Sequence, residues 1–413
     1  SSAWGLEADI RLKWFSAASA LPDHDLQRQL GDTPSYDHTV DLRLMFEQRA
    51  GTLNFLLDHS TVLLSGDAVA LGRDPNSAVD QTVTDDERRW FDLTWDIEDG
   101  DHHRSFHRLD RLAVQWQPGD WSFTFGRQAV SWGSGIVFQP LDLFSPFSPT
   151  VVDRDYKAGD DLLLADRLLP NGHDLQLLHV VRRDFDGDVD SSVSSTAFKW
   201  HGYMGATEFE LVAAEHYDER VLGASLRMGL GQALLRADVV ATQYESLLRG
   251  DREWRVSGIL NADVSFMLGP RNAYVFGEYF HNDWGVAELP DNVLQLPPEL
   301  QVRLQRGELF NLMKDYLAVG GSLEWHPLVT HTVTLISNLH DRSSLLQMQV
   351  NYEPGDHQRL QFGWLEPLGA SGDEFGGVPV VTLPKPGAQR GSGGEVLTTG
   401  GASRFYLRWV YFI

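Results

Sequence analysis

The stretch from Gly126 to Asp161 holds the most conspicuous group of residues that could do chemistry. Its prolines restrict the backbone and its glycines permit tight bends, so the segment can keep one fixed shape. It carries charges of both signs, namely Arg127, Asp142, Asp153, Arg154, Asp155 and Lys157. Opposed charges on a stiff loop suit a pore constriction that filters solutes. The alternative is a loop that seals a wall through ion pairs, and the sequence leaves both open.

A second group of acidic residues has the oxygen chemistry of a calcium site. In "RDFDGDVDSS" the carboxylates recur at every second residue, at Asp184, Asp186, Asp188 and Asp190. Calcium prefers such ligands, but Gly187 falls at the fourth position of the loop and not at the sixth, as an EF-hand requires. The segment is therefore either a calcium site in an external loop or a solvated acidic turn. The run "EDGDHH" at 98–103 is a weaker candidate for a divalent metal.

The net charge and the missing cysteines exclude several classes of protein. The chain of 413 residues has a net charge of -24, which repels nucleic acid. It contains no cysteine, so disulfides, thiolate metal sites and covalently attached c-type haem are excluded. It has no G-x-S-x-G, H-E-x-x-H or phosphate-loop motif. We therefore expect neither an enzyme nor a covalently bound cofactor.

Alternation of apolar and polar residues is the main structural signal. In the C-terminal run "RFYLRWVYFI", every second side chain is apolar, from Phe405 to Ile413. The runs 6–14 and 254–268 alternate in the same way. Period two is the period of a β-strand, and runs of about 9 to 14 residues match tilted strands that cross a bilayer. We therefore predict an all-β fold, a single antiparallel transmembrane barrel over residues 1–413.

The connections between these runs differ in length in a regular way. Tight turns such as "QPGD", "GPRN" and "EPGD" alternate with long segments, as in outer-membrane barrels with short periplasmic turns and long external loops. The long external loops are predicted at 65–103, 129–159, 283–314 and 367–401. Termini on the same side require an even strand number, which favours about 18 strands and assigns "RRWFDLTWDIED" at 88–99 to a loop. The segment 129–159 is then the third external loop, which can fold into the lumen.

The two chain ends indicate export and assembly in the outer membrane. The first residue is not Met, which we interpret as a mature chain whose signal peptide has been removed. No apolar run reaches the roughly 18 residues of a membrane helix. The strand 404–413 resembles the C-terminal assembly signal of bacterial outer-membrane barrels, although it ends on Ile413 instead of Phe. This resemblance implies the barrel-assembly machinery as a partner, with membrane lipid and lipopolysaccharide around the wall.

A longer resemblance runs through residues 126–161. The pattern "GRQ…WGxG…F.P.DLF.P", followed by "DRDYKAGDD", resembles a broad group of Gram-negative outer-membrane barrels. Alginate-export-like porins belong near this group, as do barrels that sheathe multihaem cytochromes in porin–cytochrome conduits. The resemblance implies the barrel class and leaves open what occupies or crosses the lumen.

With the apolar faces toward lipid, the polar faces of the strands line the lumen. The basic residues predicted there are Arg11, Arg43, Arg111, Arg255 and Arg408. Acidic residues are interleaved with them, whereas an exporter of a polyanion would need a strongly basic lumen, so that function is disfavoured. Arg127 continues the apolar side of "WSFTFGR", so it either snorkels to the interface or is turned inward by a bulge. We favour the inward orientation because the resemblance includes this arginine.

Two functions follow from these observations. The first is an outer-membrane channel for small polar solutes, constricted by the loop at 129–159. The alternative is a structural barrel that sheathes a multihaem cytochrome, whose haem must come from another polypeptide because this chain has no C-x-x-C-H motif. A sheath needs a lumen wide enough for a protein, whereas a selective channel needs the third loop folded inward.

Overall fold

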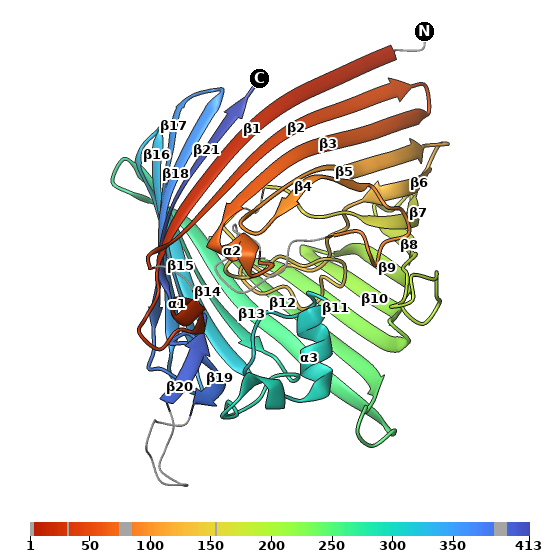
Figure 1. The fold of residues 1–413 in the computed structure, drawn as a ribbon. Helices are drawn as coiled ribbons and strands as arrows, with labels where there is room; N and C mark the ends of the chain where they lie inside the picture. The colour runs from red at the N-terminus through yellow and green to blue at the C-terminus, as the bar shows by residue number, and fades with distance from the viewer. Residues whose placement is uncertain (1–3, 31–32, 74–84, 153–154, 384–394) are drawn as a thin grey trace.

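The computed structural model describes residues 4–30, 33–73, 85–152, 155–383 and 395–413 as an antiparallel β-barrel (Figure 1). Eighteen strands form the closed wall. They are β1 (Trp4–Ala20), β2 (Ser35–Ala50), β3 (Leu53–Gly66), β5 (His103–Trp116), β6 (Trp121–Gln128), β7 (Asp160–Leu168), β8 (Asp174–Val180), β9 (Ser195–Met204), β10 (Thr207–His216), β11 (Glu219–Leu230), β12 (Ala233–Glu245), β13 (Arg252–Leu268), β14 (Arg271–His281), β15 (Asp315–His326), β16 (Val329–Asn338), β17 (Ser344–Gly355), β18 (Gln358–Leu368) and β21 (Ser403–Phe412).

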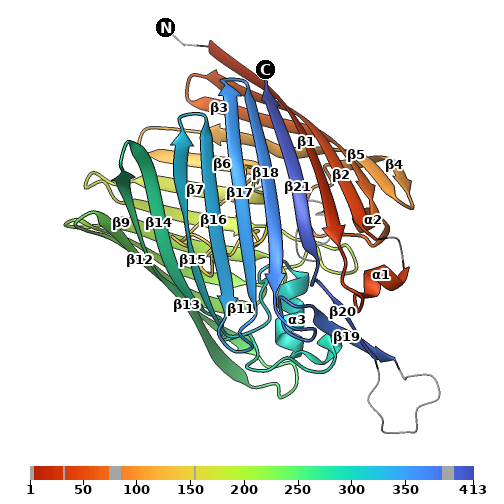
Figure 2. The same ribbon diagram turned by 90° about the vertical axis from the view of Figure 1, so that its left-hand side faces the viewer.

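Pairing of the first and last strands closes the barrel. β1 pairs with β21 in antiparallel register, with Trp14 opposite Trp409. Both chain ends lie at the same end of the barrel in Figures 1 and 2, as an even number of strands requires. The all-β prediction and the count of about 18 strands are confirmed. Within the described residues no helix is both long and apolar enough to span a membrane.

Strand faces alternate as the sequence predicts. On β21, Phe405 points outward and is 56% exposed, whereas Arg408 points inward and is 3% exposed. The outer row is apolar, as expected of a wall that contacts lipid, and the inner row is covered by segments that lie inside the wall. The same alternation of exposed and covered residues runs along β9 and β13.

The wall is irregular beside β5. A short strand, β4 (Thr94–Gly100), pairs with β5 from His103 to Arg108, while β6 pairs with β5 from Leu112 to Trp116. The prediction that 88–99 lies wholly in a loop is wrong for residues 94–99, which belong to β4. β6 ends at Gln128 and β7 begins only at Asp160. β4 pairs with the part of β5 that lies beyond the end of β6, toward the outer end of the barrel. The chain therefore leaves the wall where β6 ends and β4 begins.

The remaining elements lie at the end of the barrel opposite the termini (Figures 1 and 2). They are α1 (Leu26–Leu30), α2 (Asp67–Ala70), η1 (Val293–Gln295), α3 (Pro298–Gln305) and the hairpin β19 (Val378–Leu383) with β20 (Glu395–Thr399). An ion pair of 2.5 Å between Arg303 and Glu219 docks α3 on β11. The longer connections thus gather at one end, while turns of a few residues such as 51–52 and 269–270 join strands at the other.

Candidate lumen site

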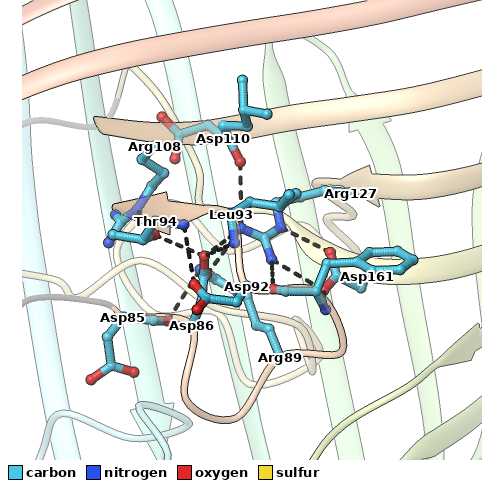
Figure 3. Close-up of polar contacts among 12 residues, drawn as sticks. Asp85, Asp86, Arg89, Asp92, Leu93, Thr94, Arg108, Asp110, Arg127 and Asp161 are labelled. Atoms are coloured by element: carbon cyan, nitrogen blue, oxygen red, sulfur yellow. Dashed lines mark hydrogen bonds and ion pairs between the residues drawn. The ribbon is translucent and has the colours of Figure 1, made fainter. Parts of the chain in front are cut away.

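Arg127 is the centre of a buried polar network (Figure 3). Its Nε donates to Asp161 Oδ1 at 2.8 Å, its Nη1 to Asp86 Oδ1 at 2.9 Å, and its Nη2 to the carbonyl oxygen of Phe91 at 2.7 Å. Asp161 in turn accepts the backbone N–H of Phe91. Burial alone would raise the pKa of Asp86, but the guanidinium groups of Arg89 and Arg127 lower it to about 2. The network ties the segment before β4 to the ends of β6 and β7.

A glycine makes this position of Arg127 possible. Gly126 has φ of +121°, and a Cβ there would lie 2.1 Å from the carbonyl oxygen of Leu112. The predicted bulge is absent, because β6 keeps an unbroken register with both β5 and β7. The backbone conformation at Gly126 breaks the alternation of exposed and buried residues instead, so Arg127 does not continue the outward row of Phe125. The side chain is only 1% exposed, however, so Arg127 holds segments together and does not present its charge to a solute. Its predicted role at an open constriction is corrected by this burial.

After β6 the chain crosses the inner face of the barrel and is held there by carboxylates. Glu278 on β14 accepts the backbone N–H groups of three successive residues, Ile136, Val137 and Phe138, at 2.7 to 2.9 Å. Asp238 on β12 accepts the N–H of Ser134 at 2.7 Å. We call Glu210, Asp238 and Glu278 the carboxylate clamp. Glu210 on β10 completes it, accepting the N–H of Gly133 at 3.3 Å.

Apolar side chains of the same loop pack against the wall between these polar contacts. Trp132, Leu141 and Phe144 form one buried cluster with inward residues of β7 to β12. Phe138 stacks on Phe280 with ring centroids 4.6 Å apart, within a second cluster on β13 to β16. The aromatic residues of the loop thus form a core inside the barrel, where burial of apolar area stabilises a single loop conformation.

Asp142 and Lys157 form a buried ion pair that joins the two halves of the loop. Lys157 Nζ lies 2.5 Å from Asp142 Oδ2 and also donates to the carbonyl oxygen of Val130 at 2.5 Å. Burial raises the pKa of the Asp142 carboxyl to about 6, against the opposing effect of Lys157, and burial lowers the pKa of Lys157. Both side chains are covered, so this pair closes the loop on itself.

Beyond this pair the loop reaches a basic part of the wall. Asp155 pairs with Arg408 of β21, with Arg11 of β1 at 3.8 Å and with Arg359 of β18 at 3.7 Å. Arg111 Nη2 donates to the carbonyl oxygen of Lys157 at 2.7 Å. Of the predicted basic lumen residues, Arg11, Arg43, Arg111 and Arg408 therefore gather around the loop end. We call Arg11, Arg43, Arg111, Arg359 and Arg408 the arginine site.

Other predicted residues lie elsewhere. Arg255 on β13 lies 3.7 Å from Asp283 and 3.8 Å from Glu253, away from the arginine site. Asp153 and Arg154 lie outside the described residues. The arginine site thus unites most of the predicted basic residues, while Arg255 belongs to the outer end of the barrel.

The acidic run 184–190 folds as a turn in the structure. Asp184 Oδ1 accepts the backbone N–H groups of Asp186 at 2.9 Å and Asp188 at 3.0 Å, and Asp190 Oδ1 accepts the N–H of Ser192 at 2.7 Å. Across the part of the chain that the structure describes, no group of three or more His, Cys, Asp or Glu residues is arranged to hold a metal ion. Calcium binding at this turn stays a prediction.

No local sequence pattern marks the carboxylate clamp or Tyr156 as functional. The clamp residues sit at inward positions of alternating strands, so their orientation could be predicted. Their partners are backbone N–H groups, which every residue except proline has, and no sequence signal marks them. The contacts of Tyr156 are with arginines from three different strands, which a local pattern cannot reveal.

Comparisons with known proteins identify the fold. No protein-family model and no curated protein matches the chain. Among solved structures, Pseudomonas aeruginosa OpdK with vanillate is similar over 99% of this chain and 98% of that chain, with TM-score 0.52 and 10% identity. P. aeruginosa OccK5 (OpdH) is similar over the same shares, with TM-score 0.54 and 9% identity, and Acinetobacter baumannii OccAB3 covers 99% of both chains, with TM-score 0.53 and 10% identity.

These structures are outer-membrane porins, and their likeness extends over the whole chain. At such low identity the likeness establishes the barrel architecture. The resemblance to alginate-export-like porins and to barrels of porin–cytochrome conduits stays a prediction.

Proposed function

We propose that the protein is an outer-membrane channel that passes small anionic solutes through the barrel lumen, with the loop at 129–159 as its constriction. One observation carries the proposal: a loop inserted between two wall strands lies across the inner face and ends on the arginine site. Arg11, Arg43 and Arg408 are covered by the loop, whereas the side chain of Arg359 is 36% exposed, so an anion in the lumen is attracted to the exposed edge of this basic cluster.

The similar structures support a channel. P. aeruginosa OpdK has been solved with vanillate, which is an aromatic carboxylate. OpdK and this chain are only 10% identical. The anionic solute class proposed for this chain therefore rests on its own arginine site. The apolar outer face and the strand 404–413 likewise support insertion among lipid and lipopolysaccharide by the barrel-assembly machinery.

The alternative, a sheath around a multihaem cytochrome, is disfavoured by the contents of the lumen. The loop at 129–159 packs in buried clusters against strands from β7 to β16 and reaches β21. A sheathed protein would have to occupy the same space. Native purification followed by a haem absorbance scan tests this alternative, since a co-purifying cytochrome would support it.

Conductance of the purified barrel in planar bilayers tests the proposed function. We expect discrete channels whose reversal potential in a KCl gradient shows preference for chloride over potassium, because the arginine site concentrates anions. Folding is checked by heat-modifiable gel migration. Folded protein that never conducts would refute the channel, and a preference for potassium would refute the anionic solute class.

A further inference from the structure

Three histidines on the outer face of the wall repeat one arrangement. His38 on β2, His107 on β5 and His179 on β8 each lie within five residues of the strand end that carries the long connections. We call these three residues the histidine girdle. In each of them, Nδ1 lies at hydrogen-bond distance from a hydroxyl on the neighbouring strand, namely Ser16 Oγ at 2.9 Å, Thr61 Oγ1 at 3.1 Å and Thr196 Oγ1 at 2.9 Å.

The alternation of strand faces turns the girdle outward. His38 is exposed between two residues that are each at most 4% exposed, and His179 is partly exposed between two residues that are each at most 1% exposed. His107 follows Phe106, which is buried. Within the described residues, the second ring nitrogen of the girdle, Nε2, has no hydrogen-bond partner. This nitrogen therefore remains for a group outside the wall.

Exposed aromatic residues indicate the depth of the girdle in the membrane. Each girdle histidine has one beside it: Tyr36 lies two residues away on the same face of β2, Trp95 is opposite His107 in the register of β4 and β5, and Phe198 lies two residues beyond Thr196 on β9. Aromatic residues gather at the membrane–water interfaces of outer-membrane barrels. Since the long connections face the exterior, the girdle lies at the level of the head groups of the outer leaflet.

The partner of Nδ1 decides what Nε2 offers to that leaflet. A hydroxyl can donate to Nδ1, which leaves the proton of a neutral imidazole on Nε2 as an outward donor. His281, at the outer end of β14, provides the contrast, because its Nδ1 lies 2.8 Å from a carboxylate oxygen of Asp315. A carboxylate only accepts, so a neutral His281 carries its proton on Nδ1 and presents an acceptor at Nε2. The girdle presents donors, whereas His281 does not.

We propose that the histidine girdle binds phosphate groups of lipopolysaccharide in the outer leaflet, through hydrogen bonds donated by Nε2. Phosphate oxygens are strong acceptors, and a hydrogen bond to an ionised acceptor is stronger than one between neutral groups. The chain has a net charge of -24, which repels an anionic lipid, so attachment at this level depends on local donors. The inference goes beyond the proposed channel, because it requires insertion in an outer membrane and not conduction through the lumen.

Native mass spectrometry of the folded, detergent-solubilised full chain tests the girdle. The probes are lipid A with two phosphates and a phosphate-free lipid A with the same acyl chains. The solution contains EDTA, which removes divalent cations that could bridge acidic loops to phosphate, and is kept at about pH 8, where histidine side chains are ordinarily neutral. We expect the wild type to bind the phosphorylated lipid roughly tenfold more tightly, because only this lipid offers ionised acceptors.

A triple variant removes the donors and keeps the aromatic surface. It combines His38→Phe, His107→Phe and His179→Phe. We expect it to bind phosphorylated lipid A roughly tenfold more weakly than the wild type, while binding of the phosphate-free lipid stays within about twofold.

Two matched controls place the same substitution elsewhere on the outer face. His331→Phe changes an exposed histidine on β16 near the short turns, at the level of the other leaflet. His281→Phe changes the histidine whose neutral ring offers no outward donor. We expect both to bind phosphorylated lipid A within about twofold of the wild type.

Several outcomes would overturn the inference. One is equal weakening of both lipids in the triple variant, since this would mean that apolar packing holds the lipid. Another is a loss in His331→Phe or His281→Phe as large as in the triple variant. Phosphatidylglycerol that binds as tightly as lipid A would overturn the assignment to lipopolysaccharide. A changed oligomeric state of the triple variant would assign this face to a second copy of the chain.

Folding and conduction are measured separately from lipid binding. Heat-modifiable gel migration checks the folding of every variant. If the triple variant does not fold, the three single variants decide, and each is expected to weaken binding of phosphorylated lipid A roughly two- to threefold. A barrel that shows the expected lipid preference but never conducts would support the girdle and refute the channel. A conducting barrel without this preference would refute the girdle alone.

Discussion

The two sides of the lumen hold the same loop by opposite means. On β10, β12 and β14, the carboxylate clamp accepts backbone N–H groups of the loop, and Glu278 alone accepts three. On β1, β2, β5, β18 and β21, cationic side chains contact two loop side chains, Asp155 and Tyr156. The first contact is fully hydrogen-bonded and buried, whereas the second leaves donors of Arg43 without partners among the described residues. The clamp therefore has the character of a permanent attachment, and the arginine side that of an exchangeable one.

The largest expected effect comes from breaking the permanent side. The Glu278→Gln variant leaves one acceptor oxygen and adds an N–H that faces the N–H groups of residues 136–138. Removing a buried charged acceptor costs about 3 kcal/mol. We expect the loop at 129–159 to detach from the wall at a lower temperature than in the wild type. We also expect a larger single-channel conductance, because a detached loop no longer narrows the lumen. Calorimetry and single-channel recording measure the two effects.

Glu324→Gln is the matched control for this change. Glu324 on β15 contacts Asn272 at the end of the barrel that carries the short turns, and it does not contact the loop. We expect it to behave as wild type. Wild-type conductance in Glu278→Gln would contradict the assignment of the clamp as the permanent attachment.

A smaller effect is expected on the exchangeable side. The Asp155→Asn variant removes the charge shared by three arginines but keeps an acceptor oxygen for Arg408 and Arg11, which are buried, and water reaches Asp155, which is 25% exposed. We expect a loss of stability of about 1 to 2 kcal/mol, smaller than that of Glu278→Gln. Chloride preference should rise in dilute KCl, and its difference from wild type should shrink at about 1 M KCl, where screening is strong. A stability loss as large as that of Glu278→Gln would show that the two sides do not differ in this way.

The smallest expected effect concerns pH at the loop after β18. Burial raises the pKa of Glu374 to about 7, against hydrogen bonds from the N–H of Leu312 and from Tyr316 and Asn338, and the nearby Asp341 carboxylate also raises it. A raised pKa means that the folded loop favours the protonated acid. The stabilising contribution is therefore complete below the ordinary pKa of 4.5 and is lost as pH rises through about 7.

Hydrogen exchange measures this dependence. After correction for intrinsic rates, amides at 369–377 should be better protected at pH 5 than at pH 8 in wild type. The Glu374→Gln variant should remove the pH dependence and keep the protection. Equal protection of wild type at both values would contradict the raised pKa.

Much of the fold could be predicted because lipid imposes a strict pattern. The outward row on β21, from Phe405 to Tyr411, had to be apolar, and the turn "GPRN" had to join two strands closely. The site was less accessible to prediction. Arg127 was expected to turn inward, but its burial depends on Asp86, which comes from a segment 41 residues earlier. Asp142 and Lys157 were both candidates, yet their pairing with each other follows only from the path of the loop.

The sequence by itself determined the barrel, its even number of strands and the side of the wall that each strand residue faces, because period two and turn chemistry are local properties. Only the tertiary structure decided which inward residues meet. Glu278 and Phe138 are 140 residues apart, and Asp155 and Arg408 are 253 apart. Their contacts depend on where the short β6 releases the chain and on the curvature of the closed wall. A period-two pattern specifies neither the end of β6 nor the curvature of the wall. The division of the lumen into a carboxylate side and an arginine side therefore appears only in the folded chain.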